Sequence, residues 1–211
     1  MKYRKHLLII VCAILAAIVL LILIAHTVIL NADFGFSREI GDEEKALRLL
    51  VTGTAENWLG CQEADGSHHP IIDLYNAYEP LTQGYTVQYD DNWCATFGSA
   101  VAIQCGFTDI IPTECGCERQ IGLFAEIGRW EENDDYVPLP GDYIFYCTTN
   151  RHLGDCTAWS DHVGIVVGTW HGYIKVIEGN NGNKVAYRYI MVNDPSIRGF
   201  GLPNYASKIN E

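Results

Sequence analysis

Residues 161–180 read DHVGIVVGTWHGYIKVIEGN and decide the class of fold. Two runs rich in Val, Ile and aromatic residues flank a short segment around His171-Gly172, a pattern typical of a β-hairpin. The similar runs DYIFY and VAYRYIMV lie before and after it, separated by Gly and Asn. The C-terminal half of the chain is therefore predicted to form short antiparallel strands.

The length of the hairpin loop decides which side chains meet. Because side chains alternate between the two faces of a sheet, a two-residue turn at His171-Gly172 places His162 and Glu178 on opposite faces. A three-residue loop, 170–172, instead places His162 opposite Asn180 and diagonal to Glu178. We expect this odd-length loop, or a compensating bulge between the two strands.

The segments before the hairpin have the pattern of helices. The predicted helices cover 42–59, IIDLYNAY, the stretch YDDNWCATFGSAVAIQCGF and ERQIGLFAEIGRW. In the third, Asp90 or Asp91 is expected near the N-cap, Cys94 in the first turn and Gly106 at the C-terminal stop. Helices first and strands later predict an α+β domain.

The N-terminus has the composition of a membrane anchor. Lys2, Arg4 and Lys5 lie in a basic flank, residues 1–6, and residues 7–30 form a long apolar run. A helix of about 20 apolar residues crosses a bilayer, and a basic flank stays in the cytoplasm. This predicts a single-pass cell-membrane anchor at 7–30, a spacer at 31–41 and an extracellular domain at 42–211. Signal cleavage after Ala32 is the alternative.

The charge of the folded part argues against a nucleic-acid partner. The chain carries 26 acidic and 14 basic residues, and three of the basic ones lie in the N-terminal flank. The remainder therefore has a net charge of about −15, with no basic patch to attract phosphates or anionic lipids.

Cys94, His162, Glu178 and Asn180 are the candidate catalytic residues. A cysteine at a helix N-terminus is favoured as a thiolate, and its own amide N–H can donate to an oxyanion. A histidine within reach can act as its base, and a third polar group can orient that base. Polar side chains at strand ends beside Val and Ile runs have no evident packing role. We expect His162, Glu178 and Asn180 on the face that looks toward Cys94.

The ordered motifs WCATFGSA, LPGDYIFY, DHVGIVVG and VIEGN resemble those of the CHAP family, cysteine- and histidine-dependent amidohydrolases and peptidases that cut peptidoglycan. The resemblance covers roughly residues 84–181, with ADGSH, IIDLYN and IRGFGLPNY similar to a bacterial subgroup. It implies a papain-like fold, in which N-terminal helices pack on a small antiparallel sheet. It also implies Cys94 as nucleophile, His162 as general base, Glu178 as the residue that orients His162, and Asn180 as a supporting group.

The resemblance implies an amidase or endopeptidase of peptidoglycan that forms a cysteine acyl-enzyme and needs no metal or other cofactor. The family usually carries a bulky apolar residue where Gly98 stands, which predicts a helix less stable by about 1 kcal/mol relative to Ala. Some members bind calcium just before the nucleophile, but a helix cap is the simpler interpretation of Asp90 and Asp91.

Two alternatives remain at this point. One is a metal-binding or redox module built on Cys115 and Cys117, although a zinc site normally needs a second pair of ligands. The other is a non-catalytic wall-binding domain on the same fold.

The cysteines also suggest one disulfide. Cys147 and Cys156 are predicted to bridge the loop after DYIFY, since only eight residues separate them and the domain is expected outside the cell. Cys94 has to stay free, and Cys61, Cys105, Cys115 and Cys117 are left unassigned.

Overall fold

The computed structural model describes residues 2–133, 135–148, 156–157 and 159–209, and it divides after Asp33 into two units. The first contains the helix α1 (Lys2–Leu30). Its segment Ile10–Leu30 is long and apolar enough to cross a membrane, and its side chains are exposed. The predicted apolar helix is confirmed. Its length and composition fit either a membrane anchor or a signal sequence.

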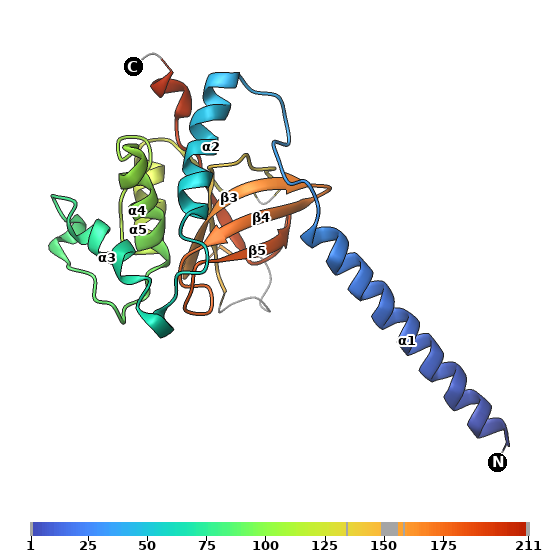
Figure 1. The fold of residues 1–211 in the computed structure, drawn as a ribbon. Helices are drawn as coiled ribbons and strands as arrows, with labels where there is room; N and C mark the ends of the chain where they lie inside the picture. Colours follow the sequence, from blue (N-terminus) through green and yellow to red (C-terminus); the bar gives the residue numbers. More distant parts are fainter. Residues whose placement is uncertain (1, 134, 149–155, 158, 210–211) are drawn as a thin grey trace. The chain divides into compact units, whose positions relative to one another are not determined.

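The second unit is an α+β domain, as predicted (Figure 1). Its helices are α2 (Asp42–Glu56), α3 (His69–Asn76), α4 (Cys94–Cys105) and α5 (Cys117–Glu126), with short 3-10 turns at Glu63–Asp65, Thr82–Gly84 and Tyr205–Lys208. Its strands are β1 (Trp130–Glu131), β2 (Tyr143–Tyr146), β3 (His162–Trp170), β4 (Tyr173–Glu178), β5 (Ala186–Met191) and β6 (Ile197–Gly201). They form one antiparallel sheet in the order β1-β6-β2-β3-β4-β5.

The two faces of the sheet have separate cores. The face toward the helices carries Tyr143, Phe145, Val163, Ile165 and Ile177, which pack with buried residues of α2, α3, α4 and α5. The opposite face carries Ile144, Tyr146, Val166, Ile174, Val176 and Ile190. This alternation is the period-two pattern of the sequence, and it buries both faces of the central strands.

The hairpin of β3 and β4 has a shorter turn than predicted. Far from the turn, however, its residues pair in the register that the longer loop predicted. Trp170 pairs with Tyr173, so the turn has two residues and the three-residue loop is wrong. Further along, Val166 pairs with Val176 whereas Gly168 pairs with Lys175, which leaves Val167 as an extra residue in β3. This is the compensating bulge that was the alternative expectation.

The backbone of Gly35 pairs with β3 directly after the bulge. Gly35 forms reciprocal backbone hydrogen bonds with Thr169, of 3.2 and 2.9 Å. A Cβ at Gly168 would lie 2.7 Å from the Gly35 nitrogen, so a side chain is not tolerated there. Gly35 thus packs closely against Gly168 and Thr169, near the C-terminal end of β3.

Helix α4 begins without the predicted aspartate cap. Its N-cap is Trp93, with no side-chain cap hydrogen bond, so the assignment of Asp90 or Asp91 to the cap is wrong. The Asp91 carboxylate instead accepts from the Gln88 N–H and the Tyr85 hydroxyl, both at 2.7 Å. The C-terminal stop is as predicted, because Gly106 is left-handed with φ 71°.

Gly98 in α4 lies in close contact with Tyr143 of β2. A Cβ at Gly98 would lie 2.8 Å from Cε1 of Tyr143, and the Tyr143 hydroxyl donates to the Gly98 carbonyl at 2.8 Å. The Tyr143 ring therefore fills the space that a larger residue at position 98 would occupy. This close packing acts against the low helix propensity of Gly98, and the expected loss of helix stability stays a prediction.

Candidate active site

His162 and Glu178 lie at the same end of the sheet, because β3 begins at His162 and the antiparallel β4 ends at Glu178. His162 Nε2 is 3.0 Å from Glu178 Oε2. The Glu178 side chain is fully buried and His162 is nearly so. An ionised carboxylate in such a place needs cationic or hydrogen-bonding partners.

Arg188 of β5 supplies a second partner to Glu178. Its Nε donates to Glu178 Oε1 at 2.5 Å, so the two carboxylate oxygens have different partners. Burial acts against the charge of Arg188, but its contact with Glu178 raises the pKa of the guanidinium overall. The Arg188 guanidinium also lies 5.1 Å from the ring centre of Tyr146, which stacks against His162 with ring centres 6.0 Å apart. Glu178 thereby contacts the Arg188 guanidinium through one side-chain oxygen and the His162 imidazole through the other.

Cys94 is the first residue of α4 and is buried. The N-terminal end of a helix stabilises a negative sulfur through its unpaired amide groups. The pKa of Cys94 is held well below its usual range, first by a hydrogen bond from the Cys117 thiol and then by hydrogen bonding and charge from His162. Burial acts in the opposite direction and is outweighed.

The shift of His162 is complementary. Burial alone disfavours the imidazolium, but hydrogen bonds to Cys94 and to Glu178 raise the pKa of His162 to about 9. Since Glu178 faces Nε2, the other ring nitrogen is left for the sulfur. The two pKa shifts run in opposite directions, and both favour a thiolate on Cys94 and an imidazolium on His162. A thiolate is the form in which cysteine is a strong nucleophile.

Strand parity places His162 and Glu178 differently from the prediction. Glu178 shares its face with Val176, since a Cβ at Gly164 would meet both side chains. This is the face opposite to the one on which α4 packs. The expectation that the pair looks toward Cys94 across the helix-side face is therefore wrong. The thiol and the imidazole meet at the end of the sheet, where α4 and β3 both begin.

Asn180 has a different contact from the one expected. It lies after the end of β4, beyond the last β3–β4 pair Ile165–Ile177, and its backbone is left-handed with φ 54°. The expected position opposite His162 stays a prediction. Its side-chain Nδ2 donates to Oδ1 of Asn92 at 3.3 Å. This bond connects the residues after β4 to the segment that leads into Cys94.

Cys117 is a neighbour of Cys94 that sequence reasoning missed. The two sulfur atoms are 3.5 Å apart, and Cys117 is the first residue of α5. Its pKa is raised well above the usual value, first by the hydrogen bond to Cys94 and then by burial. A cysteine just before a predicted helix was visible in the sequence, but its proximity to Cys94 depends on how α4 and α5 pack.

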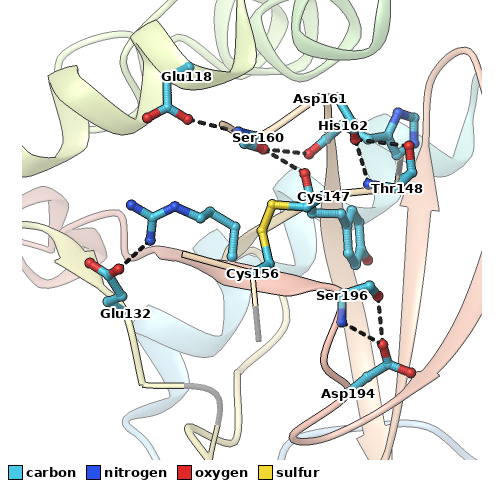
Figure 2. The surroundings of a disulfide bond; sticks show 12 residues. Glu118, Glu132, Cys147, Thr148, Cys156, Ser160, Asp161, His162, Asp194 and Ser196 are labelled. Carbon is cyan, nitrogen blue, oxygen red and sulfur yellow. Dashed lines mark hydrogen bonds and ion pairs between the residues drawn. A yellow bond between two sulfur atoms is a disulfide. The ribbon is translucent and has the colours of Figure 1, made fainter. Parts of the chain in front are cut away.

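The chain that leads into His162 is fixed by α5 and by the segment after β2 (Figure 2). Glu118, next to Cys117, accepts from the Ser160 N–H at 2.9 Å. Ser160 donates to the Tyr146 carbonyl at 2.8 Å, and Asp161 accepts from the Thr148 N–H at 2.6 Å. The start of α5 thus contacts both Cys94 and the segment that leads into His162.

The predicted disulfide is present in the same region. Cys147 and Cys156 are joined, with Cα atoms 5.9 Å apart, and the bond closes the loop before Ser160 (Figure 2). Most of that loop, residues 149–155 and 158, lies outside the described residues. The disulfide links the end of β2 to the segment that precedes His162.

Potential metal ligands do not gather in the part of the chain that the structure describes. It contains no group of three or more His, Cys, Asp or Glu side chains placed to hold a metal ion. His68 is buried, with its Nε2 2.9 Å from the Tyr89 carbonyl oxygen.

Comparison with protein-family profiles, with curated proteins and with solved structures finds no match to the chain.

Proposed function

We propose that the chain is a cysteine hydrolase that cuts an amide bond of peptidoglycan, with Cys94 as nucleophile. The observation that carries the proposal is the buried series Cys94–His162–Glu178, in which the thiol and the imidazole shift each other's pKa. A structural cysteine in a core has no need of such neighbours. Perturbed ionisable groups at the junction of three elements are typical of catalytic sites.

The proposed reaction has two stages. The Cys94 thiolate attacks the amide carbonyl, and the N–H groups at the start of α4 stabilise the resulting oxyanion. His162, already protonated, donates its proton to the leaving amine. His162 then takes a proton from water, which attacks the thioester and releases the acyl group. Glu178 keeps the imidazole oriented and stabilises its positive charge.

The choice of peptidoglycan as substrate rests on the CHAP resemblance. The motifs that carry it include the start of α4, β2, β3 and the end of β4, and these elements meet around Cys94 and His162. Helices packed on an antiparallel sheet, with the cysteine at a helix start and the histidine on a strand, are compatible with the papain-like fold that the resemblance implies. Both an N-acetylmuramoyl-L-alanine amidase and an endopeptidase fit this chemistry.

The proposed location is the outer face of a cell membrane, with α1 as a single-pass anchor and the basic flank in the cytoplasm. Two observations support it. Ile10–Leu30 has the length and hydropathy of a membrane span, and the Cys147–Cys156 disulfide is typical of an oxidising compartment. Such an anchor would hold the domain beside the wall.

The contact between Cys94 and Cys117 favours one second candidate, a thiol redox module on the same fold. Two adjacent thiols, one of low pKa, are also the arrangement of disulfide oxidoreductases. The buried Glu178 beside His162 argues for hydrolysis, because thiol exchange needs no general base oriented in this way.

Digestion of purified peptidoglycan tests the proposal. The full-length chain in detergent is incubated with peptidoglycan, and new amino and carboxyl termini are identified by mass spectrometry. We expect cleavage by the wild type and by Cys105→Ser, and none by Cys94→Ala or His162→Ala with unchanged circular dichroism. A fully active Cys94→Ala variant would refute the mechanism, and an inert wild type would favour the wall-binding or redox alternatives. The termini also separate an amidase from an endopeptidase.

A further inference from the structure

Cys94 and Cys117 occupy equivalent positions on two different helices. Each is the first residue of its helix, α4 for Cys94 and α5 for Cys117, and both side chains are buried. Their sulfur atoms are 3.5 Å apart, in van der Waals contact. The contact therefore brings together two reduced thiols from segments that are 23 residues apart in sequence.

The other free cysteines of the domain have different neighbours. The Cys105 sulfur is 3.3 Å from the Thr54 hydroxyl, and the Cys115 sulfur is 3.5 Å from the Glu114 carboxylate. Cys61 is partly exposed and packs at the edge of the helix-side core. In the described part of the domain, Cys117 is the free cysteine that contacts the nucleophile.

We propose that Cys94 and Cys117 form a reversible disulfide when the protein meets a low-molecular-weight disulfide. A disulfide bond is about 2.05 Å long, so the sulfur atoms have to approach by about 1.5 Å. Both cysteines lie at helix ends, where a side-chain rotation or a small shift of the first turn can supply this movement. This site goes beyond the proposed hydrolase and does not depend on it.

The exchange proceeds in two balanced steps. The Cys94 thiolate attacks one sulfur of the small disulfide, forms a mixed disulfide and releases one small thiolate. Cys117 then loses its proton and attacks the Cys94 sulfur, which releases the second small thiolate. Counted from the dithiol form, the protein loses two protons and two electrons, and the small disulfide takes them up to become two thiols. A dithiol reductant reverses both steps.

Two features of the site assign the roles in this sequence. Cys94 attacks first because the helix α4 N-terminus and His162 stabilise its thiolate. Cys117 acts second because its sulfur already touches the sulfur that the mixed disulfide would carry. Where Cys94 is the nucleophile of the proposed hydrolase, the disulfide would block catalysis and also protect the sulfur from irreversible oxidation.

Peptide mapping tests the proposal without any substrate. The full-length chain in detergent, with its free thiols reduced, is incubated with oxidised glutathione, and remaining thiols are alkylated. Trypsin is unsuitable because no Lys or Arg lies between Arg48 and Arg119. Chymotrypsin cuts after aromatic residues, and it separates Cys94 in CATF from Cys105 in GSAVAIQCGF and from the pair in TDIIPTECGCERQIGLF.

We expect a disulfide-linked product of CATF and the Cys117 peptide. Neither Cys94 nor Cys117 should be alkylated before reduction, and both should be alkylated after treatment with dithiothreitol. Cys115→Ser is the matched control, because it leaves Cys117 as the one cysteine of its peptide and the cross-link should persist. In Cys117→Ser, glutathione should remain on Cys94.

Recovery of glutathione on Cys94 of the wild type, with Cys117 fully alkylatable, would overturn the proposal, as would a link from Cys94 to Cys115. The peptide map of the wild-type protein alone shows whether Cys94 is linked to Cys117, so the test does not depend on the folding of any variant. If the link forms and the reduced protein cuts no peptidoglycan, the proposed hydrolase fails and the disulfide stands.

Discussion

His162 Nε2 lies 3.0 Å from Glu178 Oε2 across β3 and β4, and the extra residue Val167 makes this contact possible. In the two-residue turn, the numbers of paired residues add to 343, as in Trp170–Tyr173. Without the bulge this register would place His162 and Glu178 on opposite faces. Beyond Val167 the sum becomes 342, as in Ile165–Ile177, and the two side chains share one face.

Replacing the carboxylate tests its effect on the base. In Glu178→Gln the imidazolium loses its ionic partner, so the pKa of His162 should fall from about 9 toward the ordinary 6.5. The measurement is an NMR titration of the His162 ring. Hydrolysis should fall but remain measurable, since Cys94 and His162 are intact. Glu126→Gln, at an exposed site in α5, is the control and should leave the titration unchanged. An unchanged pKa in Glu178→Gln would show that the carboxylate does not act on His162.

The pH dependence of Cys94 alkylation follows from the paired shifts. Its lowered pKa predicts rapid reaction with iodoacetamide at pH values where an ordinary thiol is protonated. Cys105 and Cys115 are internal controls, because burial raises the pKa of both and they should react only at higher pH. In His162→Ala the Cys94 profile should move upward, because the thiolate loses its cationic partner. A Cys94 profile that coincides with that of Cys105 would contradict the thiolate.

The class of fold followed from local patterns in the sequence. Period-two runs located β2, β3, β4 and β5, and apolar spacing located the helices, because both patterns reflect burial of one face. The strands β1 and β6 were not predicted. The first has two residues and the second, IRGFG, contains two glycines, so their pairing with each other and with β2 specifies them more than their own composition.

The site was predictable only where local rules decide it. A cysteine at a helix start, and a histidine and a glutamate at strand ends, were visible in the chain. A compensating bulge between the two strands was one of two expectations, but its position at Val167 was not visible in the chain, because strand pairing decides it rather than side-chain pattern. The contact of Cys117 with Cys94 was not predicted either, because it depends on how α4 and α5 pack. The contact of Arg188 with Glu178 was not predicted because it depends on the order of the strands.

Cell fractionation tests the proposed anchor. With α1 retained as a span, the full-length chain should remain in the membrane after alkaline washing, and protease added to intact cells should remove the domain. A variant with two charged residues in the span, Ile18→Lys and Leu21→Lys, should reduce insertion, because each charge near the bilayer centre costs about 2.5–3.5 kcal/mol. A mature N-terminus at Asp33, in the medium, would support a cleaved signal sequence instead.

Removing the disulfide should lower the free energy of unfolding by about 2–3 kcal/mol, as expected for a short closed loop. The variant is Cys147→Ser with Cys156→Ser, measured by denaturant unfolding of the chain in detergent under non-reducing conditions. Cys105→Ser, which removes a free thiol, is the control. Because the bond lies just before Ser160 and the approach to His162, hydrolysis should also fall. Equal stability of the double variant and the control would contradict a structural role.

Two glycines in helices should respond to alanine in opposite directions. A Cβ at Gly53 in α2 would have nothing within 4 Å, so Gly53→Ala should raise the free energy of unfolding by about 0.5–1 kcal/mol through helix propensity. Replacing Gly98 in α4 by alanine should bring the same gain in helix propensity. There, however, the new Cβ would lie 2.8 Å from the Tyr143 ring, which is fully buried and whose hydroxyl donates to the Gly98 carbonyl.

Gly98→Ala should therefore lower the free energy of unfolding by about 1–3 kcal/mol, as overpacking of a rigid core does. The loss can come from overlap of the new Cβ with the Tyr143 ring or from a weakened hydrogen bond of the Tyr143 hydroxyl, and the double variant Gly98→Ala with Tyr143→Phe separates these causes. If ring overlap dominates, the double variant stays destabilised. If the hydrogen bond dominates, Tyr143→Phe alone accounts for most of the loss. Stabilisation by Gly98→Ala equal to that by Gly53→Ala would show that α4 does not approach β2 as closely as described, and Cys94 at the start of α4 would then lose its fixed position beside His162.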